Sequence, residues 1–143
     1  MLQEFFGYCL TPEMQLKKAL LLLGESDTGK STVLFVFKDL IGEINYSNVS
    51  LKNMGHPQYT PMMINKLVNI DTDVDKNAAD YEANFKKITA YEEIECNQKY
   101  LAAFRFRPEC RIILSANIFP KITDHSSAFY NRLIIIPFDR IFL

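Results

Sequence analysis

An apolar run that stops at a glycine constrains the fold of this chain more than any other feature. Residues 19–23 are all apolar and can form a buried strand, and Gly24 follows directly. Residues 24–31 then match a phosphate-binding pattern: a glycine, any four residues, a second glycine, a lysine, and a serine or threonine. The apolar residues 33–37 are typical of the first turns of a buried helix. This succession places backbone N–H groups and the positive end of a helix dipole around one anion.

The residues of this loop suit the binding of a nucleoside triphosphate. Lys30 can reach the β- and γ-phosphates, and the Ser31 hydroxyl can ligate Mg²⁺. Gly29 permits a backbone approach that a side chain would block. We therefore expect ATP and Mg²⁺ as ligands; the alternative is a glycine turn that merely ends an ordinary strand. The expected nucleotide-binding residues are Gly24, Glu25, Ser26, Asp27, Thr28, Gly29, Lys30, Ser31 and Thr32.

The composition narrows the class of protein. The 143 residues suffice for one domain with a sizeable core, and 48% hydrophobic with 23% charged residues is the balance of a soluble globular protein. No apolar run approaches the ~20 residues that cross a bilayer, so we expect no membrane partner and a cytoplasmic location. The net charge of −1 means that nucleic-acid contact requires a local basic patch. Cys9, Cys96 and Cys110 are widely spaced and are expected to be reduced thiols.

A second apolar stretch ends in acidic residues. Residues 66–75 predict a buried strand that leads into Asp71 and Asp73. In open parallel sheets, ligands bind beyond the carboxyl ends of the strands. Carboxylates at that edge can hold Mg²⁺ and polarise an attacking water. We therefore expect Asp71 and Asp73 to be metal ligands and catalytic residues together with Ser31; the alternative is a solvated acidic turn.

The remaining periodicities complete an α/β pattern. Short apolar runs predict further strands at residues 111–117 and 133–136. The other expected elements are helices at residues 1–10, 79–90 and 124–131, a helix after the phosphate loop that ends near residues 41–42, a mostly irregular segment at residues 45–61 with one short helical piece, and a β-hairpin at residues 92–106 with its turn at Asn97-Gln98. Strands separated by helical or loop crossovers predict a P-loop NTPase fold, with a mostly parallel sheet flanked by helices.

The order of these parts resembles the superfamily 3 helicase domain, in the branch of P4-type phage and plasmid primases and poxvirus D5-like primase-helicases. The resemblance covers nearly the whole chain and rests on five segments, at residues 24–32, 66–73, 86–99, 112–120 and 131–138, with Phe142 beyond them. It implies an AAA+-like ATP hydrolase that moves on single-stranded DNA as a ring, of the hexameric kind. It also implies a fragment of a longer primase-helicase, partnered with a primase domain or other replication proteins, in a bacterial cytoplasm if phage or plasmid encoded.

The resemblance assigns roles to further residues. The amide of Asn117 suits a sensor between the γ-phosphate and the attacking water, although without the resemblance a turn residue is the simpler interpretation. Arg132 is implied to be an arginine finger that acts on the nucleotide of a neighbouring subunit, and the alternative is a helix-end arginine paired with a surface acid. DNA contact is expected from basic residues at and before the hairpin, which otherwise form a solvated face. These residues are Lys86, Lys87 and Lys99.

Two departures from the family pattern bear on these roles. The family's hairpin usually opens with a glycine and an acid, whereas this chain has Tyr91-Glu92. Relatives often carry glutamate at the position of Asp73, so that the water-positioning role could shift to Asp71.

A small-molecule P-loop kinase is a competing interpretation, although its lid would want arginines, and residues 45–61 contain none. A nucleotide-binding interaction module without turnover is a third.

Overall fold

Five parallel strands form the central sheet of the computed structural model, which describes residues 1–124 and 126–142. Their order across the sheet is β2-β3-β6-β1-β7. The strands are β1 (Ala19–Leu23), β2 (Tyr46–Ser47), β3 (Val68–Asp71), β6 (Arg111–Ala116) and β7 (Leu133–Pro137). The predicted fold class, a mostly parallel sheet flanked by helices, is therefore confirmed.

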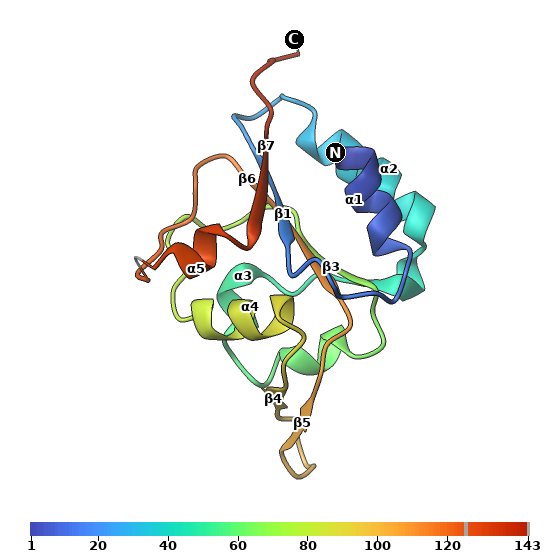
Figure 1. Cartoon of the computed structure of the whole chain (residues 1–143), viewed down its shortest axis with the longest axis vertical. Coiled ribbons are helices and arrows are strands. Elements are labelled where there is room, and N and C mark those ends of the chain that lie inside the picture. The colour runs from blue at the N-terminus through green and yellow to red at the C-terminus, as the bar shows by residue number, and fades with distance from the viewer. Residues whose placement is uncertain (125, 143) are drawn as a thin grey trace.

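Helices cover both faces of this sheet (Figure 1). On one face lie α1 (Leu2–Cys9) and α2 (Lys30–Ile41). On the other lie α3 (Leu51–Met54), α4 (Glu82–Thr89) and α5 (Ser127–Tyr130). The short 3₁₀ helices η1 (Glu43–Asn45) and η2 (Thr60–Met63) flank the outer strand β2 and its loop.

Alternation of side chains along β1 explains why both faces are covered. Leu20 and Leu22 belong to the cluster beneath α1 and α2, whereas Leu21 packs toward α4. All three are fully buried, which is worth about 1.5–3 kcal/mol for each side chain. A strand buried on both sides cannot alternate with polar residues, and this is why β1 is a continuous apolar run.

Strand β2 was not predicted from the sequence. It contains two residues, and its place is set by polar side chains on the neighbouring strand β3. Asn69 accepts hydrogen bonds from the Ser47 hydroxyl and the Val49 N–H, both at 2.8 Å, and donates to the Val49 carbonyl at 2.8 Å. Hydrogen bonds to the buried amide of Asn69 thus fix the position of β2, and no apolar pattern marks this strand in the sequence.

The antiparallel hairpin of β4 (Ile94–Cys96) and β5 (Phe104–Phe106) is confirmed, but its predicted turn is wrong. Ile94 pairs with Phe106 and Cys96 with Phe104, so that residues 97–103 form the connection. The Asn97 N–H donates to the Pro57 carbonyl at 3.0 Å instead of closing a two-residue turn. The resulting loop forms one extremity of the molecule (Figure 1).

Candidate nucleotide-binding site

The phosphate loop lies between β1 and α2, as the sequence predicts. Gly29 has φ +89° and ψ 4°, a left-handed conformation that glycine adopts without strain, and helix α2 begins at the next residue, Lys30. Within the loop, the Thr28 hydroxyl donates to the Glu25 carbonyl at 2.7 Å. The loop is therefore closed by its own side chains, and the helix N-terminus faces the space beyond it.

The Lys30 side chain is folded back over this loop. Its ammonium donates to the carbonyl oxygens of Gly24 and Glu25, both at 2.6 Å, and only 6% of the residue is exposed. These two carbonyls hold the ammonium at the rim of the loop. A phosphate oxygen that enters the loop can accept from the same ammonium donor, so Lys30 fits the binding of a triphosphate.

A cleft of 640 Å³ opens at the carboxyl edge of the sheet. It brings together side chains that follow three different strands, and its lining is largely polar. The lining residues are Ser26, Asp27, Gly29, Lys30, Ser31, Thr32, Leu34, Phe35, Lys38, Thr72, Asp73, Ser115 and Asn117. Parallel strands end at one edge of the sheet, which explains why segments so distant in sequence meet there.

Asp73 and Asn117 both line the cleft at this edge. Asp73 is carried by the turn after β3, and the Val74 N–H donates to the Ser115 carbonyl of β6 at 3.0 Å. Asn117 follows β6, and its amide nitrogen lies 3.4 Å from the Ser26 hydroxyl oxygen. The structure therefore places both predicted residues at the cleft with Lys30 and Ser31.

Asp71, which was predicted to share the metal with Asp73, is the last residue of β3. It is 7% exposed and is not among the residues that line the cleft, whereas Thr72 and Asp73 after it are. One carboxylate oxygen accepts the Leu51 N–H at 2.7 Å and the other accepts the Asp73 N–H at 3.3 Å. Burial raises the pKa of this carboxyl above its ordinary value. Asp71 thus holds the start of α3 and the turn that carries Asp73.

A second cavity lies on the other side of the first turn of α2. Its volume is 460 Å³ and it shares Gly29 and Thr32 with the cleft. Most of its wall comes from residues 137–142, which we call the C-terminal strap. The Phe138 N–H donates to the Leu23 carbonyl at 2.7 Å and the Phe142 N–H to the Asp27 carbonyl at 2.8 Å, so that the strap crosses the phosphate loop.

The sequence does not predict that this apolar cavity is part of the site. Its walls are Thr28, Gly29, Thr32, Val33, Pro137, Phe138, Asp139, Arg140 and Phe142. The signal that could have found it is the return of aromatic residues after the last strand, at Phe138 and Phe142. The guanidinium of Arg140 lies 5.3 Å from the centre of the Phe142 ring.

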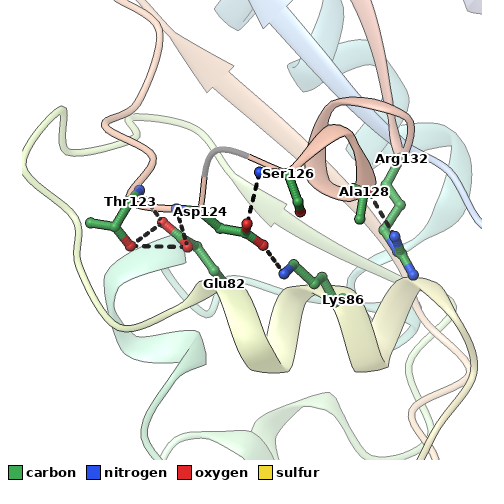
Figure 2. Close-up of polar contacts among 7 residues, drawn as sticks. All are labelled: Glu82, Lys86, Thr123, Asp124, Ser126, Ala128 and Arg132. Carbon is green, nitrogen blue, oxygen red and sulfur yellow. Dashed lines mark hydrogen bonds and ion pairs between the residues drawn. The ribbon is translucent and has the colours of Figure 1, made fainter.

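Arg132 is not at the cleft of its own chain. It follows α5, and its Nη1 donates to the Ala128 carbonyl at 2.6 Å (Figure 2). Its Nε is buried and makes no hydrogen bond to the described residues. The alternative interpretation, a helix-end arginine paired with a surface acid, has no counterpart among the ion pairs of residues 1–124 and 126–142.

The three lysines expected to contact DNA occupy three different environments. Lys86 forms an ion pair with Asp124 inside the chain, and this pairing lowers the pKa of the Asp124 carboxyl (Figure 2). Lys87, its neighbour on α4, is exposed. Lys99 is also exposed and lies in the loop of the hairpin. On the strands of that hairpin, Arg105 pairs with Glu95 at 3.6 Å, and just outside them Arg107 pairs with Glu93 at 3.9 Å.

Within the described residues, no group of three or more histidine, cysteine, aspartate or glutamate side chains could hold a metal. Mg²⁺ does not require such a group, because it commonly binds through one or two carboxylates together with substrate phosphates and waters. Ser31 and Asp73, both at the cleft, fit this kind of partial ligand set.

The part of the chain that the structure describes also contains no helix long and apolar enough to traverse a bilayer.

The parallel sheet, the glycine loop and the cleft at its edge define an α/β protein of the phosphate-loop type. A family model described as a family of unknown function (DUF5906) matches residues 22–132, and the chain belongs to this family. No curated protein matches it.

Solved structures share the fold at low sequence identity. The A-form apo structure of the NrS-1 C-terminal region superposes with a TM-score of 0.67 at 20% identity, over 96% of this chain and 33% of that one. The X-ray structure of JCV helicase superposes with a TM-score of 0.59 at 18% identity, over 95% of this chain and 38% of that one. The chain thus spans little more than a third of these proteins.

Proposed function

We propose that this chain is the ATP-hydrolysing motor domain of a superfamily 3 helicase that moves on single-stranded DNA. The observation that carries the proposal is the convergence of Lys30, Ser31, Asp73 and Asn117 in one cleft at the carboxyl edge of a parallel sheet. A turn that merely ends a strand would not be accompanied by a carboxylate and an amide from two other strands. The fold shared with JCV helicase supports the same assignment.

Each residue of the cleft has a distinct task in this proposal. Lys30 supplies positive charge to the β- and γ-phosphates, and the N–H groups at the start of α2 bind the phosphate oxygens. Mg²⁺, bound to Ser31 and Asp73, would neutralise charge that develops on the phosphates. The Asn117 amide can donate to the γ-phosphate and accept from the attacking water. Asp71 has an indirect part in this proposal, because it does not line the cleft and its carboxylate accepts the Asp73 N–H.

The second cavity gives the nucleoside a place. The phosphates occupy the loop, and the nucleoside extends past Thr32 on the side away from Asp73. There the C-terminal strap offers the rings of Phe138 and Phe142 to a planar base. A largely apolar wall with a few polar groups is what a base-binding cavity needs.

Turnover in this proposal requires a second copy of the chain. Arg132 lies outside the cleft, on the segment after α5, so its guanidinium would act on the nucleotide of the adjacent subunit. Such a finger acting in trans needs a head-to-tail ring, of which the hexamer is the form that the family resemblance implies. The buried Nε has no hydrogen-bond partner among the described residues. The side chain therefore retains a donor that its present contacts do not use.

Single-stranded DNA would contact the loop of the β4–β5 hairpin through Lys99, with Lys87 as a second contact. The carboxylates of Glu95 and Glu93 offset Arg105 and Arg107, whereas Lys99 at the tip remains exposed. Lysine contacts to phosphates bind without sequence readout and weaken with salt. The P4-type or D5-like character, with a primase domain elsewhere in the full protein, is the finest level of this proposal.

The test is ATPase activity with and without a single-stranded oligonucleotide. We expect hydrolysis that the oligonucleotide stimulates, and loss of hydrolysis in Lys30→Ala. This variant should fold, although it melts at a lower temperature because the Gly24 and Glu25 carbonyls lose their hydrogen-bond donor. Lys52→Ala, an exposed lysine on α3, is the matched control and should keep the parent activity. Parent-level hydrolysis by Lys30→Ala would show that the phosphate-loop assignment is wrong.

A mixing experiment tests the finger. Arg132→Ala subunits should bind ATP without hydrolysing it, and mixing them with Lys30→Ala subunits should restore part of the activity. Rescue arises because a mixed ring pairs an intact phosphate loop with an intact finger from its neighbour. Mixed rings that are assembled, as seen by electron microscopy, and yet inactive would refute the action of Arg132 in trans.

A further inference from the structure

The first turn of α4 holds residues 118–124, here called the connecting segment, which lead from Asn117 toward Arg132. This segment contains no helix or strand of its own. The Glu82 carboxylate accepts the N–H of Thr123 at 2.6 Å and the N–H of Asp124 at 3.0 Å, and it also accepts the Thr123 hydroxyl (Figure 2). One side chain of α4 therefore fixes the backbone of the connecting segment at two consecutive residues.

A second set of contacts comes from the same helix and the residue before it. Lys86, one turn after Glu82, pairs with the Asp124 carboxylate, which also accepts the Ser126 N–H at 2.9 Å (Figure 2). The buried Tyr81 donates its hydroxyl to the Lys121 carbonyl at 3.0 Å. The contacts with α4 thus extend over most of the second half of the connecting segment.

Helix α5, which precedes Arg132, is packed on α4 as well. The ring of Phe129 lies 4.8 Å from that of Phe85 and 6.0 Å from that of Tyr81, measured between centroids. All three side chains are fully buried. The connecting segment and the helix that positions Arg132 are therefore fastened to the same support.

Residues 90–93 join the far end of α4 to the hairpin. The Glu92 N–H donates to the Lys87 carbonyl at 2.8 Å, and the Tyr91 N–H to the Ile88 carbonyl at 3.1 Å, so that two backbone hydrogen bonds tie this connection to the last turn of α4. Helix α4 consequently touches the hairpin at one end and the connecting segment at the other.

We propose that α4 is a rigid link between the hairpin and the segment that carries Asn117 and Arg132, and that Glu82 and Lys86 are positioning residues of this link. The inference rests on the proposed function, since it gives Lys86 a role in coupling in place of the DNA contact expected from the sequence. A rigid element held at both ends transmits a displacement, and such coupling is reciprocal between its two sites.

Hydrogen exchange of the isolated chain tests the link without requiring rings, DNA or turnover. Mg²⁺ with a non-hydrolysable ATP analogue is added, and backbone exchange of residues 94–106 is followed by mass spectrometry. In the parent chain, we expect the exchange rates of the hairpin to change by about fivefold or more, at the lower end of typical coupling between sites. Calorimetry on the same samples measures the affinity for the analogue.

Two variants and one matched control locate the coupling. Lys86→Met and Glu82→Ala should bind the analogue with parent affinity but lose the response of the hairpin. Lys52→Met removes the same charge from an exposed position on α3 and should keep the response. Asp124→Asn combined with Lys86→Met should be no worse than either change alone, because both remove one contact.

The outcomes separate this inference from the proposed function. A parent chain that binds the analogue without any response of the hairpin overturns the link, as does a Lys86→Met variant that keeps the parent response. A lower melting temperature of Lys86→Met with the response intact would make the pair a structural contact only, which also overturns the inference. Absence of analogue binding to the parent chain overturns the proposed function, and the inference with it.

Discussion

Replacement of Gly24 by alanine should damage the protein through the C-terminal strap, and the size of the effect follows from the structure. A Cβ atom at Gly24 would lie 2.2 Å from the Phe138 carbonyl oxygen and 2.9 Å from the Phe138 Cβ. Ordinary contact begins at 3.4 Å, so that the strap must move by more than 1 Å. This movement pulls directly on the hydrogen bond from the Phe138 N–H to the Leu23 carbonyl, which is 2.7 Å long.

The free energy of unfolding should fall accordingly. Forced insertion of a methyl group into a packed site costs about 1–3 kcal/mol, and the weakened hydrogen bond adds about 0.5–1.5 kcal/mol. The two ranges add to roughly 1.5–4.5 kcal/mol, and because the two effects overlap we expect roughly 1.5–4 kcal/mol for Gly24→Ala. At about 3 °C per kcal/mol for a domain of this size, the melting temperature should drop by roughly 5–12 °C.

Thermal unfolding followed by circular dichroism is the assay, and Gly7→Ala is the control. Gly7 lies in α1, and a methyl group added there would have no heavy atom within 4 Å, so alanine meets open space. Alanine is the better helix former by about 0.5–1 kcal/mol, and Gly7→Ala should raise the melting temperature. A Gly24→Ala variant that melts within about 2 °C of the parent would refute the close approach of the strap, since even 1 kcal/mol shifts the midpoint further.

Further predictions concern the two aspartates, the second cavity and the thiols. Asp73→Asn should bind nucleotide but hydrolyse it at least about tenfold more slowly, whereas equal damage from Asp71→Asn in a turnover assay would contradict the separation of their roles. Because the pKa of Asp71 is raised, the folded chain holds that proton more tightly than the unfolded chain. The stability of the parent relative to Asp71→Asn, measured in urea, should therefore fall as the pH rises from the ordinary carboxyl value of 3.8 through the raised value. Phe142→Ala should weaken ATP binding by about tenfold while tripolyphosphate binds as before, because only the base packs on the aromatic ring; equal weakening of both ligands in calorimetry would place the base elsewhere. Burial raises the pKa of Cys9 and Cys110 to about 12, so iodoacetamide should label neither thiol at pH 8 in the folded chain, and labelling before unfolding would contradict their burial.

The central sheet could be predicted because its strands are buried on both sides. β1 and β6 have every residue, or all but one, buried, and such strands appear in the sequence as continuous apolar runs between turn residues. The phosphate loop could also be predicted from the sequence, since its glycines and lysine are close together in the chain. The position of Asp73 and Asn117 at the cleft follows from strand direction alone, because the carboxyl ends of parallel strands share one edge.

The elements that escaped prediction depend on partners far away in the sequence. β2 pairs with β3 through Asn69 at a separation of more than twenty residues, and no local pattern marks either end of that contact. The hairpin connection is pinned by Pro57, and the strap is recognisable only once Phe138 is seen against Gly24. In each case the geometry depends on a group distant in the sequence, which local periodicity does not reveal.

The lysines of α4 show what the helical period can predict about their contacts and what it cannot. Consecutive residues of a helix point about 100° apart, so Lys86 and Lys87 cannot both face the same strand of DNA from one turn. The buried residues Phe85, Ile88 and Thr89 define the inner face of α4. Lys86 lies on the side of Glu82, one turn earlier, where both reach the connecting segment. The period alone separates the two lysines, but only the fold supplies the carboxylate, Asp124, that takes Lys86 away from the surface expected to bind DNA.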